Sequence, residues 1–313
     1  MLRRLLLAVP TLFLVSVFIF FLMRVLPGDT AVVMAISGET GLDREQVERL
    51  RRQLGLDEPL VIQYVDWLGG LLRLDLGESA FSRRSVRSDL GERLPRTVEL
   101  AFLSMACATL IGVTLGILSA VRRDKPEDLL VRTVSVGGLC LPVFWFALLG
   151  LVLLARLFQW IPPVRYESLW EDPLSNLSQM ALPATVLGFY QAAALSRLTR
   201  SAMLEVLGRE FVRTARAKGL LERTVLVRHA LRNAALPILT LAAAQLTHLL
   251  NGAVVIEHIF AIPGVGSYLL QGVAQRDYEV VQGTVMVYGV LVIALNLMVD
   301  LLYMRLDPRV RAV

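Results

Sequence analysis

The chain has 313 residues, of which 55% are hydrophobic, and its mean hydropathy is +0.60. This composition is too apolar for a soluble globular domain and indicates a protein that crosses the membrane several times. The formal net charge is +5, but the basic residues lie beside apolar runs, so the membrane explains them better than nucleic acid does. Cys107 and Cys140 both fall inside predicted spans, which argues against a disulfide framework and against a cysteine metal site.

Six apolar stretches are each expected to cross the membrane as a helix, so the predicted fold class is an all-α membrane protein. Residues 5–23 follow a basic head that contains Arg3 and Arg4, and they are long enough to span. A signal peptide would have a shorter apolar core and a small-residue cleavage site, so this first helix is predicted to stay uncleaved. The other predicted spans are residues 100–121, 133–155 with Pro142 inside, 180–195, 233–256 and 280–299.

A small external insert, residues 27–96, is predicted between the first two spans. Asp43 and Gln46 form a capping-box pattern for a helix that Gly55 can end. A second amphipathic helix is expected over residues 60–72, whose aromatic residues suit the membrane interface. The predicted organisation is therefore an N-terminus with the first helix (1–26), the insert (27–96) and a five-helix core (97–313) that contains a cytoplasmic loop, 197–232.

Basic residues predict the orientation of the chain. The short external loops carry only Arg156, Arg165 and Arg276, whereas the predicted internal segments hold eighteen Lys and Arg residues. Basic residues gather in short cytoplasmic loops, while long loops translocate largely regardless of charge. Both termini are therefore predicted to be cytoplasmic. Within the second span, Gly112 and Gly116 have the small-xxx-small spacing that permits close helix packing.

The sequence contains no recognisable catalytic motif. HExxH, GxSxG and GxxxxGK[ST] are absent, so the chain is not expected to be an enzyme or to hydrolyse ATP itself. The predicted spans have no Asp, Glu, Lys or Arg in their cores. Because an ion-coupled carrier usually needs such a residue, this argues against a self-contained secondary transporter.

A loosely polar stripe marks the fifth predicted span. Gln245, His248 and Asn251 follow i, i+3, i+6 spacing. Such a stripe lines either a helix–helix contact or a water-filled path. A lone intramembrane His more often bonds a neighbouring helix; the alternative is a substrate-facing role. These three residues are the candidate translocation path.

The segment 209–237 is basic and ends in Pro237 where the fifth span begins. Residues 210–218 are predicted to form a helix that Gly219 ends, followed by a second short helix over residues 220–228. Gly219 is expected to let the chain turn where a Cβ would be crowded. The plainer interpretation is a topology signal alone. The sharper interpretation is an elbow that inserts into a groove on a soluble partner.

With these residues in view, the chain resembles the inner-membrane permeases of peptide-type ABC importers, the dipeptide, oligopeptide and nickel branch. Residues 210–219 resemble that branch's form of the EAA loop: Ala215 and Gly219 match the general pattern, whereas Arg213 and Thr214 depart from it. Stretches similar to those that recur in the branch cover nearly the whole chain: 26–29, 54–57, 75–79, 93–95 with Thr97, Phe260 with 263–266, 276–278 and 307–309.

The resemblance implies a type I importer and a B-type permease subunit in a bacterial or archaeal inner membrane. Its implied partners are a second permease, two cytoplasmic ATPases that hold ATP and Mg²⁺, an extracytoplasmic binding protein and the lipid bilayer; no cofactor or metal is expected on this chain. The implied coupling residues are Glu210, Arg213, Thr214, Ala215, Lys218, Gly219, Leu221, Arg223, Val225 and Arg228. The implied external gate residues are Glu257, Phe260, Pro263, Gly264 and Gly266.

Short peptides are the predicted cargo, because a neutral polar path suits zwitterionic backbones without binding any of them tightly. Nickel, a metal chelate or glutathione is the alternative. His248 alone offers too few ligands for selective metal binding, although a carried chelate would need none.

Overall fold

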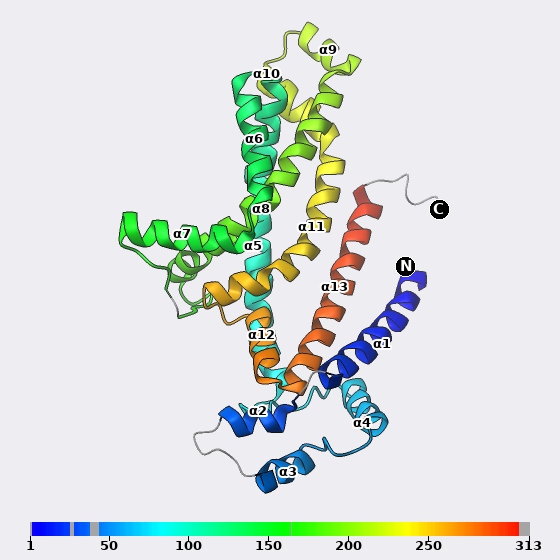
Figure 1. Cartoon of the computed structure of the whole chain (residues 1–313). Helices are drawn as coiled ribbons and strands as arrows, with labels where there is room; N and C mark the ends of the chain where they lie inside the picture. The colour runs from blue at the N-terminus through cyan, green and yellow to red at the C-terminus, as the bar shows by residue number, and fades with distance from the viewer. Residues whose placement is uncertain (1, 26–27, 38–43, 164, 307–313) are drawn as a thin grey trace. The chain divides into compact units, whose positions relative to one another are not determined.

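The computed structural model describes residues 2–25, 28–37, 44–163 and 165–306. Within those residues every regular element is a helix, apart from one isolated bridge between Glu78 and Ser85 (Figure 1). The chain divides into two compact units: unit 1 comprises Met1–Arg96 and Pro263–Leu297, and unit 2 comprises Thr97–Ile262 and Met298–Val313. The all-helical prediction is confirmed for the described part of the chain.

Unit 1 combines the N-terminal part of the sequence with residues 263–297. Its helices are α1 (Leu2–Val25), α2 (Thr30–Ser37), α3 (Arg44–Gln53), α4 (Leu60–Leu72), the start of α5 (Val86–Val121), α12 (Val265–Gln275) and most of α13 (Tyr278–Leu306). Two clusters hold these helices together. One packs Val86 and Leu90 of α5 against Tyr268 of α12, and the other packs Ile19 of α1 against Val281 of α13.

The insert contains the helices that the sequence predicts. α4 has the predicted bounds, and α3 ends two residues before Gly55, which has the left-handed φ of +63°. Asp43, the predicted cap, lies outside the described residues. α5 begins at Val86, well before the predicted start at residue 100. Its first turns are helical because Val86 and Leu90, one turn apart, are buried in the unit 1 core.

Unit 2 is a helical bundle around α8. Besides the rest of α5 it holds α6 (Pro126–Cys140), α7 (Val143–Phe158), α8 (Pro173–Leu207), α9 (Glu210–Ala217), α10 (Glu222–Thr224), the π-helical turn η1 (Val225–Leu231) and α11 (Arg232–Ile259). α8 contacts α6, α7 and α11. A core cluster joins Leu195 and Met203 of α8 to Ala108 of α5 and Ile238 of α11.

Close approach of α5 and α8 depends on glycine. A Cβ on Gly112 would lie 2.7 Å from the Leu195 Cβ, and one on Gly116 would lie 2.5 Å from the Thr199 Cβ. Gly188 of α8 meets the Cys107 Cβ of α5 in the same way, at 2.7 Å. The predicted close packing at Gly112 and Gly116 is therefore present, with α8 as the partner helix.

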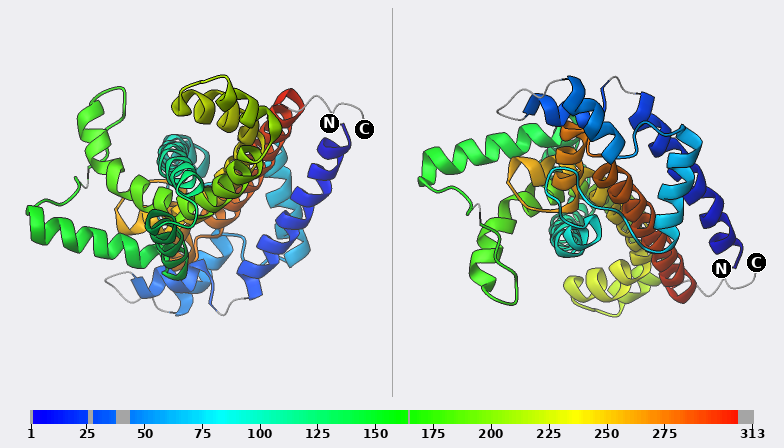
Figure 2. Two further views of the ribbon diagram at one scale, coloured as in Figure 1. Left: turned by 90° about the horizontal axis from the view of Figure 1, so that it is seen from above. Right: turned by 90° about the horizontal axis from the view of Figure 1, so that it is seen from below.

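The predicted third span, residues 133–155 with Pro142 inside, is not a single continuous helix. The structure divides it into α6 and α7, which meet at an angle of 105°. Leu141 has an extended backbone (ψ 137°) and precedes Pro142, which has no N–H to continue the helix. α7 then projects from the rest of unit 2 (Figure 2).

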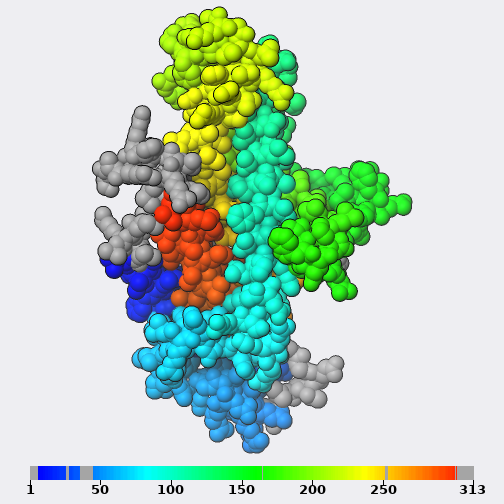
Figure 3. Space-filling view, turned by 180° about the vertical axis from the view of Figure 1, so that it is seen from behind, coloured from blue at the N-terminus to red at the C-terminus, as the bar shows by residue number. Residues whose placement is uncertain are grey.

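The described helices that are long and apolar enough to cross a membrane number four, or five if the bent α6–α7 pair is one span. The predicted fourth span, 180–195, lies inside α8, which falls outside that set. α8 carries fourteen buried residues, among them Gln179, Asn176 and Thr199. Because other helices surround it, α8 does not need an apolar surface on all sides. By contrast, the large apolar side chains of Phe102, Leu110 and Leu118 on α5 are exposed. Figure 3 shows the face of the molecule along which this part of the chain, coloured cyan to teal, runs.

Candidate functional site

The predicted helix–glycine–helix elbow is present in unit 2. α9 ends in a Schellman motif, in which the Gly219 N–H donates to the Arg216 carbonyl (2.9 Å) and the Leu220 N–H donates to the Ala215 carbonyl (3.4 Å). Gly219 has φ +74°, the left-handed region that glycine adopts without a Cβ penalty. No atom lies within 4 Å of a Cβ built there, so the expectation of crowding is wrong and backbone conformation is the reason for glycine.

The elbow closes on a small apolar core. Val212 and Ala215 of α9 are buried with Val225 of η1 and pack against Val206 and Leu207 at the end of α8. Ala215 and Val225, both predicted coupling residues, therefore hold the elbow together and do not reach its surface.

A two-point ion pair spans the turn. Arg216 Nη2 lies 2.7 Å from Glu222 Oε1, and Arg216 Nε donates to Glu222 Oε2 at 3.1 Å. The hydrogen bonds that Arg216 donates to the Glu222 carboxylate raise the pKa of Arg216 above its usual value. The pair connects the end of α9 to the start of α10, and the sequence prediction missed Arg216.

The outer surface of the elbow presents basic and apolar side chains together. The remaining predicted coupling residues are all exposed: Glu210, Arg213, Thr214, Lys218, Gly219, Leu221, Arg223 and Arg228. Leu221 is 78% exposed, and two large apolar residues that were not predicted, Phe211 and Leu220, are 44% and 41% exposed. Apolar side chains exposed beside charges are typical of a surface that another protein covers.

The second arm of the elbow differs from the predicted short helix over residues 220–228. It starts at Glu222 and continues without a break through η1 into α11. The π-helical turn buries Val225 and Ala230. Turns of this kind are frequent at functional sites. The elbow is thus an extension of the helix that holds the polar stripe.

The carboxylate of Asp128 is buried in the first turn of α6. Arg200 of α8 donates through Nε and Nη2 to the two oxygens of Asp128, both at 2.8 Å, and Ser119 of α5 donates to the same carboxylate. Arg132 Nε lies 3.5 Å from Asp128 Oδ1. This network joins three helices, and no pattern in the sequence pairs residue 128 with residue 200.

The predicted path residues do not share one environment. Gln245 is 5% exposed and its Nε2 donates to the Gln191 carbonyl of α8 at 3.3 Å. The Gln245 Oε1 atom is buried without a hydrogen-bond partner among the described residues. His248 is exposed. The side chain of Asn251 lies outside the described residues, so the stripe is described only in part.

The predicted gate residues fall in different units. In unit 2, Glu257 is fully buried and accepts a hydrogen bond from Thr97 Oγ1 at 2.6 Å, while Phe260 is buried nearby at the end of α11. In unit 1, the Pro263 carbonyl accepts from Arg96 Nη1 at 3.1 Å, and Gly264 and Gly266 are buried at the start of α12.

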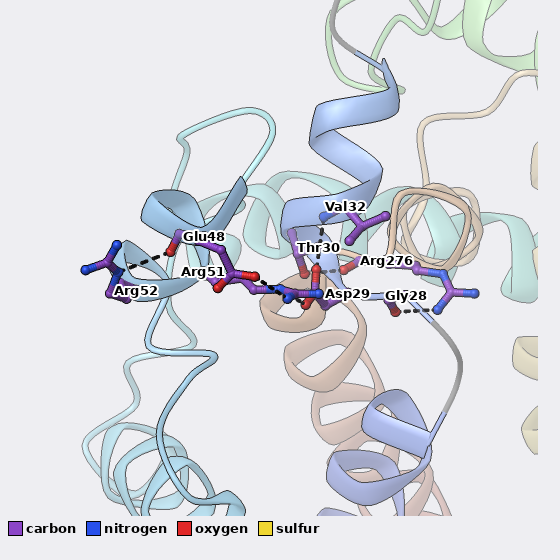
Figure 4. A network of polar contacts seen from close by, with 8 residues as sticks. All are labelled: Gly28, Asp29, Thr30, Val32, Glu48, Arg51, Arg52 and Arg276. Atoms are coloured by element: carbon purple, nitrogen blue, oxygen red, sulfur yellow. Dashed lines mark hydrogen bonds and ion pairs between the residues drawn. The ribbon is translucent and has the colours of Figure 1, made fainter. Parts of the chain in front are cut away.

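The recurring stretches of unit 1 bind one another. Thr30 Oγ1 donates to the Arg276 carbonyl at 2.6 Å, and Arg276 Nη1 donates to the Gly28 carbonyl at 2.5 Å (Figure 4). Asp29 caps the start of α2 by accepting from the Val32 N–H, and it accepts from Arg51 Nε at 2.7 Å. That hydrogen bond raises the pKa of Arg51.

A second set of contacts joins the insert to α12 and α13. Ser79 Oγ donates to Asp277 Oδ2 at 2.7 Å, and Tyr268 OH donates to Asp89 Oδ2 at 3.0 Å. Burial of the Tyr268 hydroxyl raises its pKa, and the negative charge of Asp89 nearby raises it further. The sequence prediction named several of these stretches but not their pairing, because the partners are far apart along the chain.

Comparisons with known proteins agree with this architecture. Residues 112–312 match the family model described as "Binding-protein-dependent transport system inner membrane component", and residues 1–101 match the model for the N-terminal part of such membrane components. Two solved structures share the fold: an amino acid ABC transporter with histidines (16% identity, TM-score 0.54) and the MetNI methionine ABC transporter (15%, 0.55). Each similarity covers 70% of this chain, and 94% and 96% of the respective transporter chains.

Full-length relatives are also found. A putative peptide transport system permease protein of Brucella abortus (strain 2308) is 41% identical, over 99% of this chain and 98% of the relative. The di/tripeptide transport system permease protein DppB of Pseudomonas aeruginosa is 39% identical, over 99% and 97%. The dipeptide transport system permease protein DppB of Escherichia coli K12 is 37% identical, over 99% and 98%. The chain therefore belongs to the family of inner membrane components of binding-protein-dependent transport systems and is the permease subunit of an ABC importer.

Proposed function

We propose that this permease carries short peptides and forms half of their path together with a second, homologous permease. The observation that carries the proposal is the similarity over almost the whole length to permeases named for peptide, dipeptide and di/tripeptide transport. The same names favour peptides over nickel, a metal chelate or glutathione. Of the predicted path residues whose side chains are described, the exposed His248 is the one available to line such a path, because Gln245 is buried against α8.

Two cytoplasmic ATPases are proposed to bind the elbow and to supply the energy of transport. Support comes from its exposed surface, where Phe211, Leu220 and Leu221 lie beside Arg213 and Lys218. Apolar anchors with a charged rim are characteristic of protein interfaces. ATP and Mg²⁺ would then be held by the ATPases, and an extracytoplasmic binding protein would deliver the peptide.

Uptake assays with the reconstituted importer test which substrate it carries. The permease, the second permease, both ATPases and the binding protein are placed in proteoliposomes, and labelled peptides of two to five residues are offered beside radioactive nickel. We expect ATP-dependent uptake of peptides. Nickel uptake without peptide uptake would overturn the proposal. Peptide uptake by this chain alone would instead indicate a self-contained secondary transporter.

A further inference from the structure

Unit 1 contains a cavity of about 800 Å³ that the proposed function does not use. It lies between α1, α4, the start of α5 and α13. Its volume is within the range of small-molecule sites, which is about 300–1,000 Å³. The lining is almost entirely aliphatic and aromatic, and includes Leu12, Phe13, Leu68, Leu94, Val290 and Leu291.

One charged residue, Arg87, stands among the described residues that line this cavity. It lies in the first turn of α5 and is exposed. In the part of the chain that the structure describes, no carboxylate forms an ion pair with it. The polar Ser16 has a different status, because its hydroxyl is already hydrogen-bonded to Phe13 and Tyr64.

The cavity extends along the helices, with Arg87 near one end. The neighbouring Val86 contacts α13 at Gly283, which places Arg87 towards the beginning of α13. From there the lining continues along α13 from Met286 to Ala294, a distance of about 12 Å at 1.5 Å per residue. Both α1 and α13 are candidate membrane spans, so the cavity leads from a charged end into the hydrocarbon region.

We propose that this cavity binds one acyl chain of an anionic phospholipid, whose phosphate group pairs with Arg87. An apolar channel with a basic group at its end complements a lipid in both shape and charge. An apolar helix of a second subunit could fill the aliphatic part, but it would make no use of the positive charge that Arg87 places at the end of the cavity. With the orientation predicted from the sequence, the lipid belongs to the extracytoplasmic leaflet.

Lipid is titrated into the purified full-length chain, and bound lipid is detected by native mass spectrometry. This experiment tests whether the charge of Arg87 contributes to lipid binding. Phosphatidylglycerol and phosphatidylcholine with identical acyl chains are compared. We expect Arg87→Gln to weaken binding of phosphatidylglycerol about five-fold, the contribution of one basic residue at an anionic membrane surface, and to leave phosphatidylcholine unchanged. The matched control is Arg52→Gln, which removes an exposed arginine of α3 that does not line the cavity and should change neither lipid.

A second variant tests the apolar part. Val290→Trp places a large ring into the cavity from a position that is 52% exposed, and should reduce retention of both lipids. The proposal fails if wild-type protein retains the two lipids equally, if Arg87→Gln behaves like Arg52→Gln, or if Val290→Trp leaves retention unchanged. Loss of the second permease from the assembled importer on Val290→Trp, with lipid retention intact, would assign the cavity to that subunit and overturn the proposal. None of these readouts depends on which substrate is transported.

Discussion

Gly219 is the residue on which the geometry of the elbow depends, through its φ of +74°. Alanine in a left-handed conformation costs about 1–2 kcal/mol, whereas asparagine tolerates it better. Because a Cβ at this position meets no atom within 4 Å, size contributes nothing. We therefore expect Gly219→Ala to reduce the amount of ATPase that copurifies with the permease, and Gly219→Asn to reduce it less.

The control for this comparison is Gly208→Ala. Gly208 ends α8 with a right-handed φ of −80°, and an added Cβ would make only ordinary contacts at 3.6 Å or more. This variant should copurify the ATPases like wild type. Equal copurification by Gly219→Ala and Gly208→Ala would show that the turn does not govern docking.

Gly116 tests the close approach of α5 and α8. A Cβ there would lie 2.5 Å from the Thr199 Cβ and 2.7 Å from the Ser196 carbonyl oxygen, so the two helices would have to separate. Overpacking of this kind typically costs about 1–3 kcal/mol. We expect Gly116→Ala to lower the thermal unfolding midpoint of the purified permease. Gly137→Ala in α6, where an added Cβ meets nothing within 4 Å, should leave the midpoint unchanged or slightly raised.

At the scale of elements, Asp128 holds α5, α6 and α8 together. Asp128→Asn removes the charge that pairs with Arg200, whose side chain is only 21% exposed. Removing one partner of a buried ion pair lowers the free energy of unfolding by about 3–5 kcal/mol. Because Arg200 is still partly exposed, we expect a decrease at the lower end of this range. Chemical unfolding of the two proteins measures this difference. Asp124→Asn removes a 72% exposed carboxylate four residues away and should have almost no effect; a similar loss in both variants would contradict the assigned role.

Elements with a local signal were predictable, and contacts between distant segments were not. The bounds of α4 follow from its aromatic and apolar periodicity, and the end of α9 follows from Gly219. The break at Pro142 was seen in the sequence but underestimated, because a proline kink in one helix and a 105° turn between two helices have the same local signal. Pairs such as Asp128–Arg200 and Ser79–Asp277 depend on the packing of helices, which a single sequence does not encode locally.

For the whole molecule, the distribution of basic residues predicts a cytoplasmic elbow and an extracytoplasmic insert. Single cysteines at Ser85 and at Lys218, both exposed, are introduced after Cys107 and Cys140 have been replaced. In intact cells or spheroplasts, a membrane-impermeant thiol reagent should label residue 85 and should reach residue 218 only after lysis. Labelling of both positions from outside would reverse the proposed placement of the elbow.

The Schellman turn of the elbow and its core of Val212, Ala215 and Val225 connect residues that are close in sequence. Such short-range contacts form quickly and need no partner to complete them. The conformational entropy of ordering this surface is therefore lost when the chain folds. In the docking proposed above, the ATPase would meet a preorganised surface, and its affinity would not be reduced by that cost. If the binding surface of the ATPase is acidic, the arginine charges of the elbow accelerate the encounter, and the association rate falls as ionic strength rises.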